Sequence, residues 1–507
     1  MSRPERQPAS AGTIPRGHVF AVQGRMELLR HDAAVVPTGP ALSISPAWRP
    51  LTGADPGVRR PRTWGRPGVR HARAGEALWL LDVERRDDAV LSWLLDGVHG
   101  VLEEIASTGT PAAGRVLPLV VVPVVGIGAG GFGDDRGAVI RGLLDVADDV
   151  VRRHAVDLAF VTPDPAVHGA VQHLRRLRHE WPLDPALLES AAGLAEQARR
   201  GELALFFGAG VSIPAGLPSW ADLLRACLAA APDLDTEDFA RLHPLDQGEL
   251  LRRVLGDRFG SVVAELADAD RHALGHSLLA ALHCREAATT NYDHLYELAA
   301  AAHVEPVVMP WRTPRGGEPW LLKLNGDVDH PESIVLARRD FLRQEMLARP
   351  AAAVLEAMML TRHLLIVGAS LTDDNVLRLT HEVAEFRAEH GGKDQPFGSV
   401  LDVETDGVRR QLWAGELEWL SMPGPDVAHR SRALDVFLDA VAAEATTDSS
   451  WVLDDRFESL LEDGDAETAR RARALWGALG DREPWVALRA ELERHGSGDE
   501  PPVPHHR

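Results

Sequence analysis

Short apolar runs that alternate with stretches of helical periodicity constrain the fold of this chain more than any other feature. The runs before Pro182 have the length and apolar character of strands buried on both faces: HVFAVQG, DAAVVPT, ALWLLDVE, VLPLVVVPVV and DLAFVTP. Between the last two of these runs, residues 136–154 carry valine, leucine, isoleucine and alanine at helical spacing. This strand–helix–strand order predicts a layered α/β fold.

The same alternation resumes after a second helical stretch, residues 183–200. The strands predicted there are LALFFGAG, EAATTNYD, EPVVMP, PWLLKLNG, SIVLA, HLLIVGAS and FGSVLDVE. We therefore expect a disordered N-terminus (1–17), a first α/β domain (18–182), a second α/β domain with a parallel, Rossmann-like sheet (183–444), and a helical C-terminal region with a flexible tail (445–507).

The charge balance and the cysteine content exclude several classes of function. The formal net charge of −21 repels a polyanion at long range, so we expect no broad nucleic-acid face. Cys227 and Cys284 are the only cysteines, too few for a four-cysteine zinc site, and we expect no bound metal. The longest apolar stretch, residues 116–125, is broken by two prolines and is too short to span a bilayer. These features predict a cytoplasmic protein without a membrane segment.

A glycine-containing turn follows the first apolar run of the second domain. The residues that could hold a phosphate there are Gly208, Ala209, Gly210 and Ser212. Glycine lets the backbone approach a diphosphate closely, and a serine hydroxyl can donate to a phosphate oxygen. Ser219, with Asp222 three residues later, predicts the capped start of the next helix. Taken alone, this glycine pair fits an ordinary strand–helix turn equally well.

Polar residues follow three further apolar runs of the same domain. They are Thr290, Asn291 and Asp293 after the second run, Asn325 and Asp327 after the run that contains Lys323, and Gly368, Ser370, Asp373 and Asn375 after HLLIV. Amide and carboxylate groups suit ribose hydroxyls and a carboxamide, and we expect Ser370 and Asp373 to hold the adenosine ribose. Each group taken alone is also explained by turn formation. Since ligands bind at the carboxyl ends of parallel strands, together they predict one nucleotide crevice.

The segments GAGVSIPAGLPSW, TTNYD, KLNGD and LLIVGASLTDDN, in this order and spacing, resemble the Sir2-like NADase family of bacterial anti-phage defence. The resemblance extends from Leu203 to about Met422. It implies a Rossmann-like sheet with NAD+ as substrate across its carboxyl edge and phosphates held by the glycine turn. It also implies that Asn291 and Asp293 face the nicotinamide ribose, and that the protein is a homo-oligomer.

Two departures from the family pattern bear on the reaction. Sir2 deacylases carry a zinc ribbon with two CxxC pairs, which this sequence lacks, and this favours simple cleavage of NAD+ over deacetylation. The family has His-Gly where this chain has Asn325 and Gly326, and an amide takes up no proton at neutral pH. Loss of a general base removes about 10²–10⁴-fold of rate without removing NAD+ binding.

The residues left for catalysis are therefore Asn291, Asp293 and Asn325. We expect Asn291 to orient the attacking water, and Asp293 or Asp327 to stabilise the positive charge that develops on the ribose. A replacement base would come from His294, His303 or His330. For each of these histidines a surface or helix-end position is the more ordinary explanation.

The first domain resembles a macro domain in its opening HVFAVQGRMELLRHDAAVVPT and in VVVPVVGIGAGGFGDDRG. By this resemblance Gly126, Gly128, Gly130 and Gly131 would wrap the diphosphate of an ADP-ribose-like or cyclic nucleotide signal, and Phe132 would lie near its distal ribose. Gly24-Arg25 and Pro37-Thr38-Gly39 depart from the family pattern, so a degenerate scaffold domain is the alternative. The arginine-rich, lysine-free stretch before residue 74 is either solvated loop or a local anion site.

Joined together, these features predict a nicotinamide-releasing NAD+ hydrolase. We expect it to act in anti-phage defence by NAD+ depletion and to be regulated by a nucleotide on the macro-like domain. A catalytically silent NAD+ or ADP-ribose sensor and a protein ADP-ribosyltransferase are the alternatives.

Overall fold

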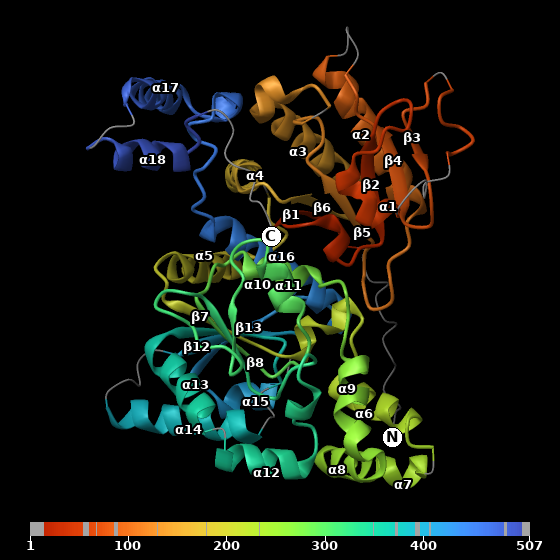
Figure 1. Ribbon diagram of the computed structural model, residues 1–507, viewed down its shortest axis with the longest axis vertical. Coiled ribbons are helices and arrows are strands. Elements are labelled where there is room, and N and C mark those ends of the chain that lie inside the picture. The colour runs from red at the N-terminus through yellow and green to blue at the C-terminus, as the bar shows by residue number, and fades with distance from the viewer. Residues whose placement is uncertain are drawn as a thin grey trace, which may run out of the picture.

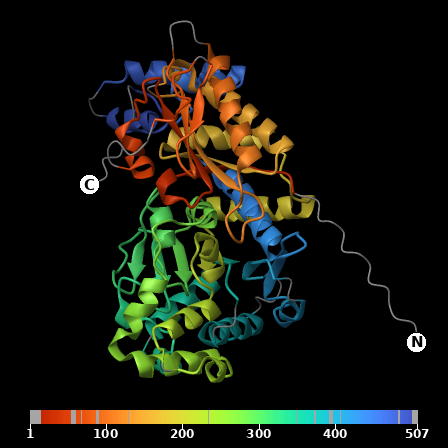
Figure 2. The same ribbon diagram turned by 90° about the vertical axis from the view of Figure 1, so that its right-hand side faces the viewer.

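The molecule contains two α/β units, each a sheet with the helices that flank it, and they lie one above the other in Figures 1 and 2. The unit that begins at β1 (Val19–Gln23) is the upper layer, and the unit that begins at β7 (Leu203–Phe207) is the lower layer. The computed structural model describes residues 15–53, 60–66, 68–85, 90–128, 130–178, 180–232, 234–347, 349–370, 374–390, 396–404, 407–480 and 484–498. The predicted disordered N-terminus, 1–17, lies mostly outside these ranges. Within them, none of the helices combines the length and apolarity that a membrane crossing requires.

The upper layer is a six-stranded sheet in the order β1-β6-β5-β2-β4-β3. Its strands are β1 (Val19–Gln23), β2 (Ala33–Thr38), β3 (His71–Arg73), β4 (Leu78–Asp82), β5 (Leu119–Pro123) and β6 (Asp157–Thr162). All neighbours pair in parallel except β3, which runs antiparallel to β4. One face packs against α2 (Leu91–Thr108), α3 (Arg136–Arg153) and α4 (Pro165–Arg178). The predicted helix at residues 136–154 is therefore confirmed.

The lower layer is a seven-stranded, wholly parallel sheet in the order β13-β12-β11-β7-β8-β10-β9. Its strands are β7 (Leu203–Phe207), β8 (Glu286–Thr289), β9 (Val307–Met309), β10 (Trp320–Lys323), β11 (His363–Val367), β12 (Gly398–Asp402) and β13 (Leu417–Ser421). One face packs against α13 (Arg349–Thr361) and α14 (Asp374–Glu389). The parallel, Rossmann-like sheet predicted from the apolar runs is confirmed.

One of the predicted strands is wrong. SIVLA, residues 333–337, forms no strand; its first residue ends a short 3-10 helix, Pro331–Ser333, and the others are in irregular backbone. Its apolar residues Ile334 and Leu336 are buried against helices, in a core that also holds residues of α6 (Trp220–Ala229), α8 (Pro244–Leu255) and α9 (Phe259–Leu266). Ser219 caps α6 as predicted, because its Oγ accepts from Asp222 N at 3.3 Å.

The two sheets share one apolar core. The second face of the upper sheet, including Phe20 and Leu119, belongs to the same cluster as Leu205 and Phe207 of β7. The helices between the sheets are α5 (Pro185–Arg199), α10 (Leu274–Ala280) and α16 (Val427–Ala445), which meet at the centre of Figure 1. Burial on both faces explains why these strands are apolar throughout.

A buried ion pair joins α16 to the upper layer. The Asp439 carboxylate accepts from the Arg175 guanidinium of α4, 3.1 Å from Nη1 to Oδ1, and lies 2.8 Å from His18 Nε2. Arg175 also donates to the carbonyl of Val19 at 2.7 Å and to Gln172 Oε1 at 2.8 Å. Every partner of this guanidinium is therefore internal, and the ion pair fixes α16 against β1 and α4.

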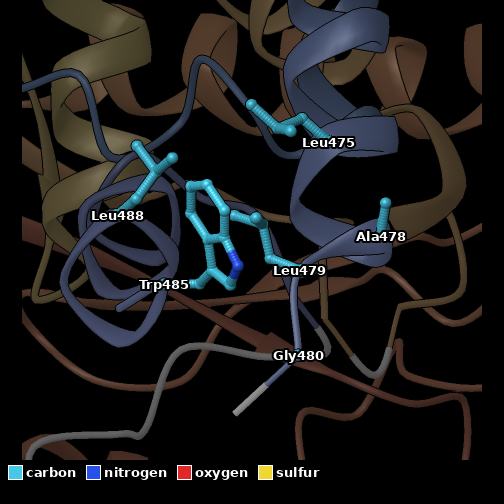
Figure 3. Close-up of a pocket in the computed structure, with 6 residues that line it drawn as sticks. All are labelled: Leu475, Ala478, Leu479, Gly480, Trp485 and Leu488. Carbon is cyan, nitrogen blue, oxygen red and sulfur yellow. The ribbon is translucent and has the colours of Figure 1, made fainter. Parts of the chain in front are cut away.

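The chain returns to the upper layer after α16. Trp451, Phe457 and Leu460 lie in the core beneath the first sheet. Ser459 Oγ donates to Asp135 Oδ1 at 2.6 Å, at the start of α3. The last helices, α17 (Asp463–Ala478) and α18 (Val486–Arg494), enclose a hollow of about 380 Å³ between Leu475, Ala478, Leu479, Gly480, Trp485 and Leu488 (Figure 3). This hollow lies in the C-terminal helices and not at the carboxyl ends of either sheet.

Candidate functional site

The four strand ends that the sequence analysis singled out lie side by side. β11, β7, β8 and β10 are consecutive in the lower sheet, and they pair in parallel. Their carboxyl ends therefore share one edge, where Gly208, Thr290, Asn325 and Gly368 follow. The chain builds β8 and β10 on one side of β7 and then crosses to β11 on the other. Such a reversal of strand order is where open α/β sheets bind ligands.

The glycines at this edge let two loops pack together. Gly210 N donates to Gly368 O at 2.9 Å, and a Cβ on Gly210 would lie 2.7 Å from Gly368 Cα. Gly368 has a φ of +62°, which side chains rarely adopt. Close approach of the β7 and β11 loops therefore already requires glycine here. Ala209, Gly210 and Ser370 are exposed at the same edge, where a phosphate or a ribose could reach them.

Ser212 joins the residues predicted to act on NAD+. Its Oγ donates to Asp293 Oδ2 at 2.8 Å and accepts from Asn291 Nδ2 at 3.0 Å. A third partner is His276 Nε2 at 3.2 Å. Ser212, Asn291, Asp293 and His276 are all buried. The glycine turn predicted that the Ser212 hydroxyl meets a phosphate; in the structure its one proton and both lone pairs are taken by Asp293, Asn291 and His276.

The hydrogen bonds fix the orientation of each member. Ala273 N donates to His276 Nδ1 at 3.1 Å, so the ring proton is on Nε2 and points to Ser212. Burial lowers the pKa of His276 to about 3, which keeps the ring neutral. The amide nitrogen of Asn291 donates to Ser212, whereas its Oδ1 accepts no hydrogen bond from any of the described residues. That oxygen is therefore available to a substrate hydroxyl or to water.

Lys323 contacts the backbone of Asp293 and two further carboxylates beside the site. Its buried Nζ lies 2.7 Å from Glu297 Oε1 and 2.8 Å from Asp327 Oδ2. It also donates to the carbonyl of Asp293 at 2.8 Å. Burial alone would lower the pKa of Lys323, but the two carboxylates outweigh it and the pKa is raised. Lys323 is thus charged, and its ion pair with Asp327 fixes the position of that carboxylate.

Asp293 and Asn325 are both removed from solvent. Burial raises the pKa of Asp293, against the opposing effect of its hydrogen bond from Ser212. Asn325 is 2% exposed at the end of β10, and its carbonyl accepts from Val335 N at 2.8 Å. Gly326 follows with its Cβ position only 2.6 Å from the Ser333 carbonyl. The β10 end is therefore closed by residues 333–335.

Not every predicted binding residue is placed. Thr290 is partly buried at the end of β8. Asn375 lies at the beginning of α14, but its side chain and the whole of Asp373 lie outside the described residues. These assignments stay predictions. Nor does any group of three histidine, cysteine, aspartate or glutamate side chains in the described ranges have the arrangement of a metal site.

The three histidines suggested as replacement bases have other surroundings. His303 packs edge-on against His283, and burial lowers its pKa to about 3, too low for a base near pH 7. His330 stacks on Trp311, with ring centroids 4.6 Å apart. His294 Nδ1 lies 3.7 Å from Asp268. The histidine that does contact the site, His276, was missed because it stands in a short helix without a recognisable motif.

The glycine loop of the upper layer follows β5, near the middle of its sheet. Gly126 has a φ of +90°, and its carbonyl accepts from Phe132 N at 3.0 Å. Phe132 is buried in the core, with the Arg85 guanidinium over its ring. Arg85 Nη1 also donates to Gly131 O at 3.0 Å. Gly128 and Gly130 complete the described part of the loop; Ala129 lies outside it.

Comparison with known proteins identifies a SIR2-like domain, whose family model matches residues 285–416. The NAD(+) hydrolase ThsA of Enterococcus faecium is 28% identical over 204 residues, which are 37% of this chain and 41% of that protein. ThsA of Bacillus cereus (strain MSX-D12) is 30% identical over 188 residues, 34% of this chain and 38% of that protein. ThsA of Acinetobacter baumannii (strain 532279) is 25% identical over 190 residues, 36% and 39% respectively. The chain thus spans about two fifths of the length of these relatives.

Proposed function

We propose that this chain, which contains a SIR2-like domain homologous to ThsA, is an NAD+ hydrolase that releases nicotinamide and acts in anti-phage defence by depleting NAD+. The observation that carries the proposal is the hydrogen-bonded group Asn291, Ser212 and Asp293 at the shared edge of four parallel strands. In this proposal the β7 loop, Gly208, Ala209 and Gly210, holds the diphosphate. Gly368 and Ser370 of the β11 loop, with Asp373 and Asn375, hold the adenosine side.

The reaction breaks the bond between ribose C1′ and the nicotinamide nitrogen. The bonding electron pair leaves with neutral nicotinamide, and water adds to C1′ and gives up a proton. Asn291 Oδ1 is free to accept from the water or from a ribose hydroxyl, while Ser212 holds the amide in place. The carboxylate of Asp293 stabilises the oxocarbenium-like transition state electrostatically.

Asn325 supplies a polar amide at the end of β10 but no general base. Neither Asn291 nor Asn325 can take up the proton of the attacking water, and the loss of a general base costs about 10²–10⁴-fold relative to a base-assisted reaction. A slow basal rate suits a hydrolase that must spare its own cell. The same substitution favours the second candidate function, an NAD+-binding sensor without turnover.

The upper layer is proposed to hold the regulatory nucleotide. Its glycine loop, Gly126–Phe132, follows a central parallel strand at the carboxyl edge, the position at which such sheets bind phosphates. An ADP-ribose-like or cyclic nucleotide bound there would reach the lower layer through the core that the two sheets share. We also propose that the protein acts as a homo-oligomer.

A turnover assay on the full chain tests the proposal. Purified protein is incubated with NAD+, with and without cyclic ADP-ribose, and free nicotinamide is measured by chromatography. We expect release that Asn291→Ala abolishes and that Asn325→His raises by at least about tenfold, because a base is restored. Circular dichroism confirms that both variants are folded. If the wild type and Asn325→His both bind NAD+ but release no nicotinamide, the protein is a sensor instead. If NAD+ labelled in its ADP-ribose part transfers the label to protein, the activity is ADP-ribosylation.

A further inference from the structure

The histidine beside the candidate site is also tied to the other layer. His276 is fully buried in α10, with Nε2 3.2 Å from Ser212 Oγ and Nδ1 3.1 Å from Ala273 N. Because Nδ1 accepts, Nε2 must donate. Ser212 can then give its only proton to Asp293, and it must accept from the Asn291 amide nitrogen. The Asp293 carboxylate, which can only accept, thus sets the direction of these bonds, and His276 occupies the second lone pair of Ser212 and holds the hydroxyl in place between Asp293 and Asn291.

The residues just before α10 pair with the upper layer. His272 N donates to Leu28 O at 2.8 Å, and Arg30 N donates to His272 O at 2.9 Å. This is a parallel β-bridge between Leu29 and His272. Leu29 itself is completely buried in the core that both sheets share. The bridge therefore holds the backbone of residues 272–273 at a fixed distance from the upper sheet.

The upper side of the bridge lies in the connection from β1 to β2, which packs in the core that both sheets share. Residues 24–30 follow β1 directly, and Gly24 N donates to Thr162 O at the end of β6 at 2.9 Å. The Arg30 guanidinium reaches further down and lies beside Gly216 in the loop that follows β7. The connection between β1 and β2 thus touches the residues just before α10 and also the loop that follows β7.

We propose that His276 is a positioning residue for Asn291, and that the Leu29–His272 bridge lets the upper layer set its position. A displacement of residues 28–30 shifts His272 and Ala273, moves the His276 ring that Ala273 holds, and so reorients Ser212 and the Asn291 amide. The mechanism rests on the proposed NAD+ hydrolysis for its effect on rate. The structural coupling itself is independent of turnover.

Variants of His276 test the positioning role. His276→Phe keeps a ring but removes the donor to Ser212, while His276→Gln retains an amide that can donate. We expect His276→Phe to lower kcat about fivefold to tenfold, the loss of one ordinary hydrogen bond, with KM changed less than about twofold. His276→Gln should recover part of the loss. A kcat of His276→Phe within about twofold of wild type, or equal losses in both variants, overturns the positioning role.

A matched pair at residue 30 tests the bridge. Arg30→Pro removes the N–H that donates to His272, and Leu29 already has the extended backbone (φ −91°, ψ 129°) that a residue before proline needs. Arg30→Ala keeps that N–H and reports the contribution of the guanidinium beside Gly216 alone. Amide hydrogen exchange is followed in residues 272–276 and in 291–297, which include the Leu295 N–H that donates to Asp293 Oδ1.

We expect faster exchange in both segments for Arg30→Pro, and in 291–297 for His276→Phe, with much smaller changes for Arg30→Ala. Faster exchange in 272–276 alone for Arg30→Pro overturns the coupling. These measurements need no catalysis. If the wild type releases no nicotinamide but the variants show the expected changes in exchange, the hydrolase proposal is refuted and the coupling between the layers stands.

Discussion

Removing the charge of Asp439 should destabilise the junction between the two layers more than any surface change. Asp439 is completely buried, and its carboxylate neutralises the buried guanidinium of Arg175. Arg175 is also bound to the Val19 carbonyl and to Gln172, so it cannot turn outwards to water. In Asp439→Leu a charge stays buried without a partner, which costs about 3–5 kcal/mol.

The double variant Asp439→Leu/Arg175→Met separates charge from packing. When both ions are replaced by apolar groups of similar size, no charge is stranded, and most of the lost stability should return. The matched control is the surface pair Arg178–Asp145, whose side chains are 41% and 64% exposed. Asp145→Leu should cost less than about 1 kcal/mol.

Thermal unfolding by calorimetry measures these differences. A loss of 3–5 kcal/mol corresponds to a fall in melting temperature of about 10 °C for a unit of roughly 200 residues. The reasoning is refuted if Asp439→Leu melts within about 2 °C of the Asp145→Leu control. It is also refuted if the double variant is no more stable than the single one.

Two further predictions concern the same junction and the C-terminal segment. Burial raises the pKa of Asp435 to about 7, so ionising this carboxyl lowers the free energy of unfolding as pH rises from about 4 through 7. Asp435→Asn does not ionise, and its free energy of unfolding relative to wild type should therefore rise by about 2–3 kcal/mol between pH 5 and pH 8. An equal difference in melting temperature between the two proteins at both pH values would contradict this. Phe457→Ala should lower the free energy of unfolding by about 3–5 kcal/mol, because Phe457 is 0% exposed in the core beneath the first sheet. The control Leu475→Ala, at a 46% exposed position, should lower it far less. Similar losses for the two variants in a thermal melt would argue against the packing seen here.

The apolar runs predicted both sheets because a strand buried on two faces needs no partner to be recognised. SIVLA failed for the same reason, since Ile334 and Leu336 are equally apolar but pack against helices. The edge strands β3 and β13 were missed. β13, with the sequence LEWLS, is short, and its burial does not alternate: Leu417 and Leu420 are buried, while Glu418 and Ser421 are exposed.

The partners of the candidate site were beyond the sequence for a different reason. The motifs brought Ser212, Asn291 and Asp293 to one edge, but their hydrogen bonds join positions 79 and 81 residues apart. Glycine motifs suggested that Ser212 meets a phosphate. Only the folded chain shows that His276, 64 residues away, shares its hydroxyl. Local patterns fix where a strand ends, whereas the choice among hydrogen-bond partners depends on tertiary packing.

The shared core restricts how a ligand on one layer could act on the other. Phe20 and Leu119 of the upper sheet pack in one cluster with Leu205 and Phe207 of the lower sheet, and the chain crosses the junction again in α16. Separating the layers would expose this cluster and strand the Asp439–Arg175 pair, which costs far more than differential ligand binding supplies. Close-packed interiors instead transmit small displacements. Any regulation from the upper layer must therefore work by shifts at contacts such as the Leu29–His272 bridge, while the two layers stay together.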